Sequence, residues 1–264
     1  MGIPYGWLAL FNLGYEVSDA CTSIVAQTPD GKILHARNLD FWAGMGFTET
    51  LKEMTVQIDF QKGGKTLFTS TSFVGMVGLL SGFKPHAFSA TVDTRFYPGG
   101  IGELFYEIIA AIEERNASLV SFLLRDVFTN EQDFQGALEN LSNDELIADV
   151  YYILAGVSAG QGAVISRNRT GADDVWLLDS PSRWFEVETN YDHWKEAPWF
   201  DDRIDPANAV MNSFGQQAIS LDNMWKTLST KPVFNLQTTY SILSCPATGE
   251  YSSFTRYCPY PCVE

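Results

Sequence analysis

The chain has 264 residues, 45% of them hydrophobic, and no low-complexity run, which predicts one compact domain with a sizeable core. Seventeen basic residues stand against 32 acidic ones, so the net charge is −15. Nucleic-acid phosphates are bound by clusters of Lys and Arg, and the sequence has no such cluster, which argues against a nucleic-acid partner. No stretch approaches the roughly 20 apolar residues that a membrane-spanning helix requires.

The N-terminal part of the chain leads to a cysteine. Residues 5–13 are apolar, but the run lacks a basic start and polar residues follow it closely, so it makes a poor signal peptide. Cys21 comes next, and the β-branched and small residues of 22–26 after it predict a buried strand. We therefore expect the Cys21 thiol to be held rigidly at the head of a core strand.

The next predicted strand carries Arg37 and Asp40, beyond a turn at residues 28–31. If this strand pairs antiparallel with the first, both side chains lie near Cys21. A cationic neighbour such as Arg37 favours the thiolate, and a carboxylate such as Asp40 can orient an amine.

Cys21 has two interpretations. A cut between Ala20 and Cys21 would free an α-amine, whose pKa of about 7.7 to 8.0 suits it to act as base for the thiol of the same residue. The alternative is a buried core thiol beside a structural pair of Arg37 and Asp40, because free cysteine is among the most buried residue types. Composition alone favours this alternative.

Hydrophobic periodicity predicts the other elements. Alternation over 54–60 and 66–72, around a Gly-Gly turn, predicts a hairpin. The glycine-containing stretch 75–82 is expected to be a loop that either packs on the core or lines a lipid-tail entrance. Helices are predicted at 101–114, 118–129, 132–141, 206–214 and 221–229, and further strands at 87–95, 150–155, 162–167, 175–178, 184–188, 238–243 and 251–256. This order suggests antiparallel sheets with helical layers outside.

Two polar residues in the second half are candidates for chemistry. Asn190 lies in Thr-Asn-Tyr-Asp, and its amide can donate two N–H bonds without adding charge, which suits it to stabilise an oxyanion. The alternative makes Asn190 a turn residue. Arg203 follows two aspartates and belongs either to a surface charge cluster or to the site.

Four separated motifs together resemble one family. They are Cys-Thr-Ser-Ile-Val-Ala from Cys21, Arg-Asn-Leu-Asp from Arg37, Thr-Asn-Tyr-Asp-His-Trp-Lys from Thr189 and Asp-Asp-Arg from Asp201. In this order they are similar to the acid ceramidase and N-acylethanolamine acid amidase family of N-terminal-nucleophile cysteine hydrolases. The resemblance covers essentially the whole chain and implies an α+β fold, the four-layer αββα sandwich of the N-terminal-nucleophile hydrolase type.

The resemblance also implies a processed enzyme. Autocatalytic cleavage between Ala20 and Cys21 would make residues 1–20 the end of an α-subunit, whose upstream part and signal peptide are absent from this chain. Residues 21–264 would form the catalytic β-subunit, which keeps the α-subunit segment as a partner. No cofactor and no metal is implied.

Residue roles follow from the same resemblance. Cys21 is the nucleophile, Asn190 holds the oxyanion, and the site also includes Arg37, Asp40 and Arg203. Asp192, His193 and Trp194 are expected to serve packing, with His193 the less favoured proton carrier.

One position departs from the family pattern. The family has a glutamate in an Asn-Glu-Arg or Asp-Glu-Arg triplet, where this chain has Asp93, Thr94 and Arg95. Because adjacent strand residues face opposite sides, Asp93 cannot simply replace a glutamate at position 94. If that carboxylate has a role, we expect Thr94→Glu to raise the rate of maturation or hydrolysis at acidic pH.

The implied substrate is a fatty-acyl amide lipid, met through transient contact with a membrane or a lipid activator. Residues 82–85, 228–233 and 258–262 look more like acid ceramidase, whereas 147–152 and 187–195 look more like N-acylethanolamine acid amidase. The C-terminal similarities are the more distinctive, so ceramide is expected by a narrow margin over fatty acid ethanolamides. A non-catalytic lipid-binding homologue is the alternative of another class.

The cysteines and sequons bear on the compartment. With Cys21 assigned to chemistry, Cys258 and Cys262 around Pro-Tyr-Pro are expected to form a short-range disulfide, and Cys245 is free or pairs outside this chain. Three sequons, at Asn116, Asn140 and Asn168, permit glycosylation. A sequence pI near 4.5 suits an acidic compartment. With the resemblance, these features predict a lysosomal or secreted protein.

Overall fold

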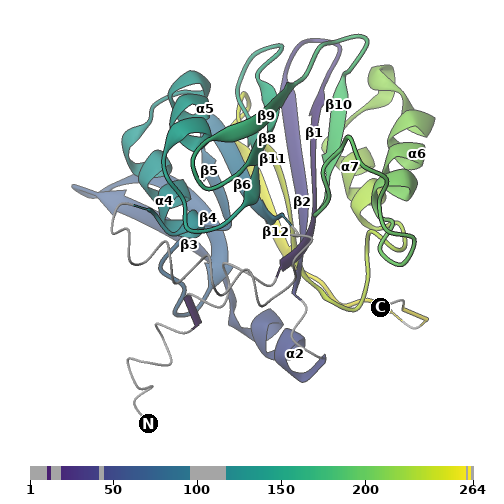
Figure 1. Cartoon of the computed structure of the whole chain (residues 1–264), viewed down its shortest axis with the longest axis horizontal. Helices are drawn as coiled ribbons and strands as arrows, with labels where there is room; N and C mark the ends of the chain where they lie inside the picture. The colour runs from purple at the N-terminus through teal and green to yellow at the C-terminus, as the bar shows by residue number, and fades with distance from the viewer. Residues whose placement is uncertain (1–10, 13–18, 42–44, 96–116, 260, 263–264) are drawn as a thin grey trace.

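The computed structural model describes residues 11–12, 19–41, 45–95, 117–259 and 261–262. Two antiparallel sheets pack face to face in it, and helices cover both outer faces (Figure 1). One outer layer consists of α4 (Val120–Asn130) and α5 (Phe134–Asn143), and the other of α6 (Ile204–Phe214) and α7 (Leu221–Leu228). The predicted αββα sandwich is thus confirmed.

The first sheet has the strand order β10-β1-β2-β11-β12 and the second the order β3-β4-β5-β6-β7-β8-β9. The first consists of β1 (Asp19–Gln27), β2 (Ile33–Phe41), β10 (Phe185–Glu188), β11 (Thr238–Cys245) and β12 (Glu250–Thr255). The second consists of β3 (Thr55–Lys62), β4 (Lys65–Phe73), β5 (Ser81–Lys84), β6 (Phe88–Thr94), β7 (Val150–Ala155), β8 (Gly162–Arg167) and β9 (Ala172–Leu177). A short 3-10 helix, η2 (Gln216–Ala218), links α6 to α7.

Alternation along β1 explains why this strand lies between two layers. Ile24 and Ala26 join the hydrophobic cluster that packs under α6 and α7. Val25 points the other way and joins the cluster between the sheets, with Ile153 of β7. Both faces of the strand are therefore buried, as the apolar run after Cys21 predicts.

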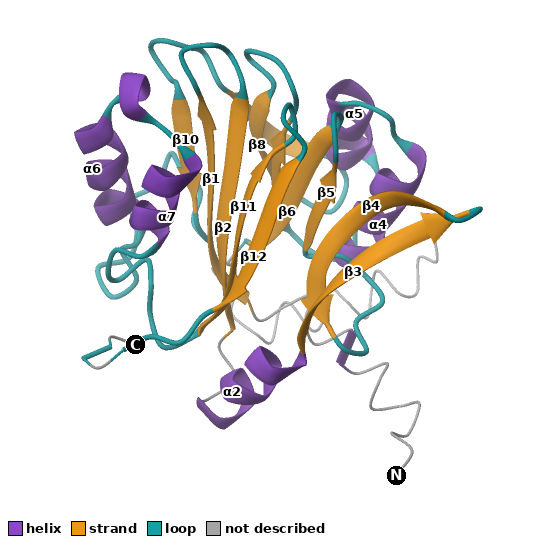
Figure 2. Ribbon diagram, turned by 180° about the vertical axis from the view of Figure 1, so that it is seen from behind, coloured by secondary structure: helices purple, strands orange, loops and turns teal. Residues whose placement is uncertain are grey.

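Helices α5 and α7 each begin with a side-chain cap. The Asp133 side chain accepts the Gly136 backbone N–H at the start of α5, and Ser220 accepts that of Asn223 at the start of α7. Such caps satisfy backbone donors that the first helical turn leaves without partners. The helices then place their apolar faces on the outer sides of the sheets (Figure 2).

Two elements differ from the sequence prediction. Helix α2 (Met45–Met54) was not expected, because its first turn contains Gly46 and its apolar residues are few. Strand β5 was not expected either, since its first two residues, Ser81 and Gly82, belong to the predicted loop 75–82. Cross-strand pairing with β4 and β6 determines β5, and that pairing has no local signal. The predicted helix at 101–114 lies outside the described residues.

Candidate active site

The hairpin of β1 and β2 brings the predicted nucleophile and arginine together. Cys21 pairs with Leu39 and Ser23 with Arg37, so the arginine side chain reaches back toward the cysteine along the same face of the sheet. Arg37 Nη2 lies 2.8 Å from Cys21 Sγ, and both side chains are buried. A guanidinium at this distance favours the thiolate form of a cysteine.

Backbone and side-chain groups next to the second sheet fix the arginine in this position. Arg37 Nη1 donates to Leu80 O at 2.6 Å and to Ser81 Oγ at 2.8 Å, and Nη2 also donates to Val92 O at 2.7 Å. Leu80 precedes β5, Ser81 begins it, and Val92 belongs to β6. The guanidinium therefore joins the two sheets directly beneath the nucleophile.

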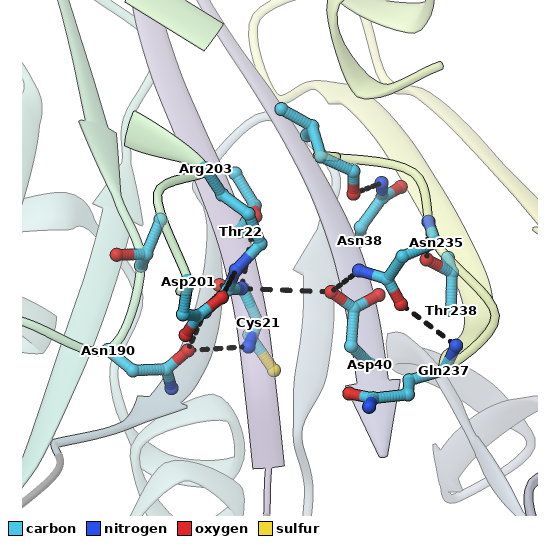
Figure 3. Close-up of polar contacts among 12 residues, drawn as sticks. Cys21, Thr22, Asn38, Asp40, Asn190, Asp201, Arg203, Asn235, Gln237 and Thr238 are labelled. Atoms are coloured by element: carbon cyan, nitrogen blue, oxygen red, sulfur yellow. Dashed lines mark hydrogen bonds and ion pairs between the residues drawn. The ribbon is translucent and has the colours of Figure 1, made fainter. Parts of the chain in front are cut away.

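The backbone of Cys21 is held by two residues distant in sequence (Figure 3). Its N–H donates to Asn190 Oδ1 at 2.9 Å, and its carbonyl accepts from Arg203 Nη1. Arg203 Nη2 also donates to Asn190 Oδ1 at 2.7 Å, and Asn190 Nδ2 donates to Thr94 O at 2.7 Å. In the intact chain, the Asn190 amide oxygen thus faces the nitrogen that cleavage would turn into the α-amine.

Arg203 stands just before α6 and is oriented by Asp201, whose Oδ1 lies 2.7 Å from Arg203 Nε. Burial disfavours the charged guanidinium, but the hydrogen bond and the charge of Asp201 outweigh it, and the pKa of Arg203 is raised. The arginine consequently stays a permanent cation next to the cysteine backbone.

Asp40 lies on the other side of Cys21 from Asn190 (Figure 3). Its Oδ2 accepts from Asn235 Nδ2 at 3.1 Å and lies 3.7 Å from Arg203 Nη1. Asp40 pairs with Ala20, so it sits beside the bond before Cys21. Burial raises the pKa of Asp40 to about 6, against the opposing attraction of Arg203.

Asp93 is a site carboxylate that sequence reasoning missed. Its side chain is fully buried, its Oδ1 accepts from Ser23 Oγ at 3.0 Å, and Arg37 Nε lies 3.5 Å away. Burial raises the pKa of Asp93 to about 7, although Arg37 and Ser23 act to lower it. Polar residues at 89, 91 and 93 alternate with apolar ones along β6, and this period of two was the available signal.

The neighbouring residue faces the other way. By strand alternation, Thr94 shares the face of Val92, which packs in the cluster under α4, whereas Asp93 points between the sheets. This agrees with the expectation that Asp93 cannot replace a glutamate at position 94. The carboxylate that reaches Arg37 is nonetheless Asp93.

Asp192 and His193, which were expected to serve packing, contact neighbouring side chains, whereas Trp194 is 48% exposed. Asp192 accepts from Tyr151 Oη and Arg95 Nε, each at 2.7 Å, and from Lys195 Nζ at 2.6 Å. Burial acts to raise the pKa of Asp192, but these hydrogen bonds outweigh it and lower the pKa. His193 stacks on the Trp176 ring with 4.0 Å between centroids, and burial lowers its pKa.

The predicted disulfide between Cys258 and Cys262 is present, which confirms that expectation. Cys245 is a buried free thiol in the core under α6 and α7. Asn140 Nδ2 donates to Glu131 Oε1 and Asn168 Nδ2 to Asp173 Oδ1, while the third sequon, at Asn116, lies outside the described residues.

No group of three or more His, Cys, Asp and Glu side chains among the described residues could hold a metal ion. None of the helices in the described part of the chain is long and apolar enough to cross a membrane.

Residues 21–222 match the model of linear amide C–N hydrolases, choloylglycine hydrolase family. Acid ceramidase of Bos taurus is 39% identical over 272 residues, which are 99% of this chain and 68% of the relative. Acid ceramidase of Homo sapiens is 39% identical over 273 residues, with the same coverage.

Solved structures give the same picture. The Caenorhabditis elegans N-acylethanolamine-hydrolyzing acid amidase ortholog is 33% identical with a TM-score of 0.79, covering 90% of this chain and 100% of that one. A conjugated bile acid hydrolase from Clostridium perfringens is 12% identical with a TM-score of 0.53, covering 89% of each chain, and supports the fold alone. The chain therefore belongs to the choloylglycine hydrolase family of linear amide C–N hydrolases, in its acid ceramidase and N-acylethanolamine acid amidase branch, and is a cysteine amidohydrolase of the N-terminal-nucleophile type.

Proposed function

We propose that the protein hydrolyses the N-acyl amide bond of a fatty-acyl lipid, with Cys21 as nucleophile after cleavage of the bond before it. The observation that carries this proposal is the environment of Cys21. Its sulfur lies 2.8 Å from Arg37 Nη2, and its nitrogen lies 2.9 Å from Asn190 Oδ1. A cation at the sulfur and an acceptor at the future amine are what a nucleophile carrying its own base requires.

Cleavage uses the same thiol. The Cys21 thiolate attacks the Ala20 carbonyl carbon, the C–N bond breaks, and the Cys21 nitrogen leaves as a protonated amine. Water then hydrolyses the resulting thioester to give the Ala20 carboxylate and a free Cys21 thiol. Asp40, which pairs with Ala20 and has a pKa raised to about 6 by burial, is placed to hold a proton beside this bond at acidic pH.

Hydrolysis of substrate repeats this chemistry on an external amide. The Cys21 thiolate attacks the acyl carbon, and Asn190 Nδ2, which carries two hydrogens, donates to the oxyanion. The α-ammonium passes its proton to the leaving amine as the C–N bond breaks. Water then attacks the thioester while the amine accepts its proton, and the fatty acid leaves.

Under this proposal residues 1–20 end an α-subunit and residues 21–264 form the catalytic β-subunit. The working compartment is the lysosome or another acidic, oxidising space. Three observations support it: the disulfide of Cys258 and Cys262, the sequence pI of about 4.5, and the name acid ceramidase borne by the curated relatives.

We favour ceramide as substrate, yielding sphingosine and a fatty acid. The 39% identity to acid ceramidases supports it, and so do the similarities in residues 228–233 and 258–262. Fatty acid ethanolamides are the second candidate, supported by the 33% identity and the TM-score of 0.79 to the acid amidase ortholog. Both substrates share the acyl amide, so the pocket for the leaving amine must discriminate between them.

Two measurements test the proposal. The first is mass spectrometry of the N-terminus after incubation at about pH 5, where a new N-terminus at Cys21 is expected. An uncleaved, inactive protein that still binds lipid would instead indicate a non-catalytic homologue. The second compares kcat/KM for ceramide and palmitoylethanolamide in the same detergent. Faster hydrolysis of the ethanolamide would reassign the substrate.

A further inference from the structure

A continuous chain of buried polar side chains runs between the two sheets, away from the nucleophile. It starts at Asp93, which accepts from Ser23 Oγ at 3.0 Å, and Ser23 Oγ lies 3.1 Å from Thr91 Oγ1. Thr91 Oγ1 lies 3.1 Å from His35 Nε2, and His35 Nδ1 lies 2.9 Å from Ser89 Oγ. All five side chains are fully buried.

The chain ends on a backbone carbonyl. Ser89 Oγ lies 3.2 Å from Ser244 Oγ, and Ser244 Oγ lies 3.4 Å from the carbonyl oxygen of His35. β1, β2 and β11 of one sheet and β6 of the other supply the members. Burying polar side chains is costly unless they form hydrogen bonds, and each of these six side chains has at least one partner, although Asp93 Oδ2 has none among the described residues.

The side chains of this chain can arrange their hydrogen bonds in two ways. Hydroxyl groups donate and accept, and a neutral imidazole has one nitrogen of each kind, whereas the terminal carbonyl only accepts. When Asp93 is ionised, Ser23 donates to it, Thr91 donates to Ser23, and His35 donates from Nε2. When Asp93 is protonated, these bonds reverse, His35 donates from Nδ1 to Ser89, and Ser244 donates to the carbonyl. Both arrangements give every hydroxyl and ring nitrogen of the chain a partner.

We propose that Asp93 is a positioning residue for the nucleophile. Its carboxyl exchanges one proton with solvent, the Ser23 and Thr91 hydroxyls reorient, and the His35 ring proton is on Nδ1 when Asp93 is protonated and on Nε2 when Asp93 is ionised. When Asp93 is ionised, it competes with the Cys21 thiolate for the positive charge of Arg37. Arg37 Nε lies 3.5 Å from Asp93 Oδ1, and Arg37 Nη2 lies 2.8 Å from Cys21 Sγ. The two anions therefore share one guanidinium, and a proton on Asp93 leaves that guanidinium to the thiolate.

The charged and titratable groups around Asp93 fit this role. Burial raises the pKa of Asp93 to about 7 and lowers that of His35 to about 3, so His35 stays neutral while Asp93 titrates. The other ionisable side chains that contact this carboxyl, pair with its strand position or act on it electrostatically are Arg37 and Asp40 of β2, Tyr151 of β7, Glu188 of β10, and Arg203 before α6.

The decisive test is the tautomer of His35, read from ¹⁵N chemical shifts of the full chain labelled at histidine. The sequence has only three histidines, and His86→Gln and His193→Gln identify the other two signals. We expect the protonated nitrogen to change from Nδ1 to Nε2 as the pH rises from about 5 to 8.5. A single His35 tautomer throughout that range would overturn the proposal.

Three variants test whether the tautomer change of His35 depends on Asp93 and on the hydroxyl groups between them. Asp93→Asn cannot titrate, and Thr91→Val removes the hydroxyl between Ser23 and His35, so the His35 tautomer should no longer change with pH in either. Asp59→Asn makes the same chemical change on the exposed face of β3 and should leave the wild-type response intact. A tautomer change in Asp93→Asn like that of the wild type would contradict the proposal.

The consequence for catalysis rests on the proposed function and is measured separately. The ratio of kcat at about pH 8 to kcat at about pH 5 should be at least threefold higher in Asp93→Asn than in wild type, with KM unchanged. An unchanged ratio would contradict the claim that the charge of Asp93 affects the reactivity of the Cys21 thiolate. The tautomer measurement needs no substrate. It therefore tests the role of Asp93 even if the protein does not hydrolyse the proposed substrate.

Discussion

Under the proposed mechanism Cys21 uses its thiol in two reactions, the cleavage of the bond before it and the attack on substrate. Its sulfur, nitrogen and carbonyl each have a partner that the fold supplies: Arg37, Asn190 and Arg203. The three partners come from three parts of the chain, so each role can be separated by substitution.

We expect Cys21→Ala to abolish both the cleavage before residue 21 and hydrolysis of acyl amide, because one thiol performs both attacks. Mass spectrometry reports the first reaction and fatty-acid release the second. Cys245→Ala is the matched control, since that thiol is buried in the core under α6 and α7 and should affect neither reaction. A cleaved Cys21→Ala protein would show that another group cuts the chain.

Asn190→Ala should lower kcat by about a hundredfold or more, as loss of an oxyanion donor typically does. Asn190→Asp keeps an acceptor for the Cys21 nitrogen and loses the donor, so it should be as inactive as Asn190→Ala if donation matters. Asn143→Ala, an exposed amide on α5, is the control. Turnover within about threefold of wild type in Asn190→Ala would reduce Asn190 to a structural residue.

At the level of elements, helix α4 packs closely on the second sheet at Gly82 of β5. A Cβ on Gly82 would lie 2.3 Å from the Phe128 ring of α4. That ring has little room to move, because it stacks on Phe88 at 4.7 Å and packs on Phe68 at 5.4 Å between centroids. Since Ser81 of the same strand accepts from Arg37, the packing of α4 bears on the site.

Gly82→Ala should therefore lower the free energy of unfolding by about 1 to 3 kcal/mol, the usual cost of overpacking a filled core. Chemical denaturation measures the change. Gly46→Ala is the control, because a Cβ there meets nothing within 4 Å and Ala favours the helix α2. Equal stability of Gly82→Ala and wild type would mean that α4 can shift away without cost.

Across the whole molecule, buried carboxyl groups dominate the response to pH. Burial raises the pKa of Asp40 to about 6, of Asp93 to about 7, of Glu186 to about 9, and of Glu188 well above its usual value. The unfolded chain releases these protons near its ordinary pKa values of about 4. Between about pH 5 and 8 the folded state thus holds more protons, and its stability falls as pH rises.

Histidine acts in the opposite sense. Burial lowers the pKa of His35 to about 3 and also lowers that of His193. Both contributions to stability decline as the pH falls below the unfolded value of about 6.5. Four raised carboxyls outweigh two lowered imidazoles among the described residues, so the net effect favours acidic conditions.

We expect the urea midpoint of the uncleaved Cys21→Ala chain to be higher at about pH 5.5 than at pH 8. Glu188→Gln should reduce this difference, because it removes one group whose folded state retains a proton. Glu139→Gln changes an exposed carboxylate on α5 and should leave the difference as it was. Greater stability at pH 8 than at pH 5.5 would contradict the sign of the argument.

The sequence by itself determined the hairpin at the centre of the site. A Thr-Pro-Asp-Gly turn and the β-branched and small residues after Cys21 place Arg37 on the strand beside Cys21, and the structure has that pairing in the predicted sense. Most other strands and helices were predictable for the same reason, because their signals lie within one segment. The short disulfide of Cys258 and Cys262 was also local.

Only the tertiary structure decided what surrounds that hairpin. Asn190 and Arg203 meet Cys21 across 169 and 182 residues of sequence, and Asp93 meets Ser23 across 70. These contacts depend on how one sheet stacks on the other and on where the segment after β10 crosses the end of β1. Periodicity shows which face of a strand is buried, but not which residue of a distant strand will lie opposite, because packing between layers carries no local signal.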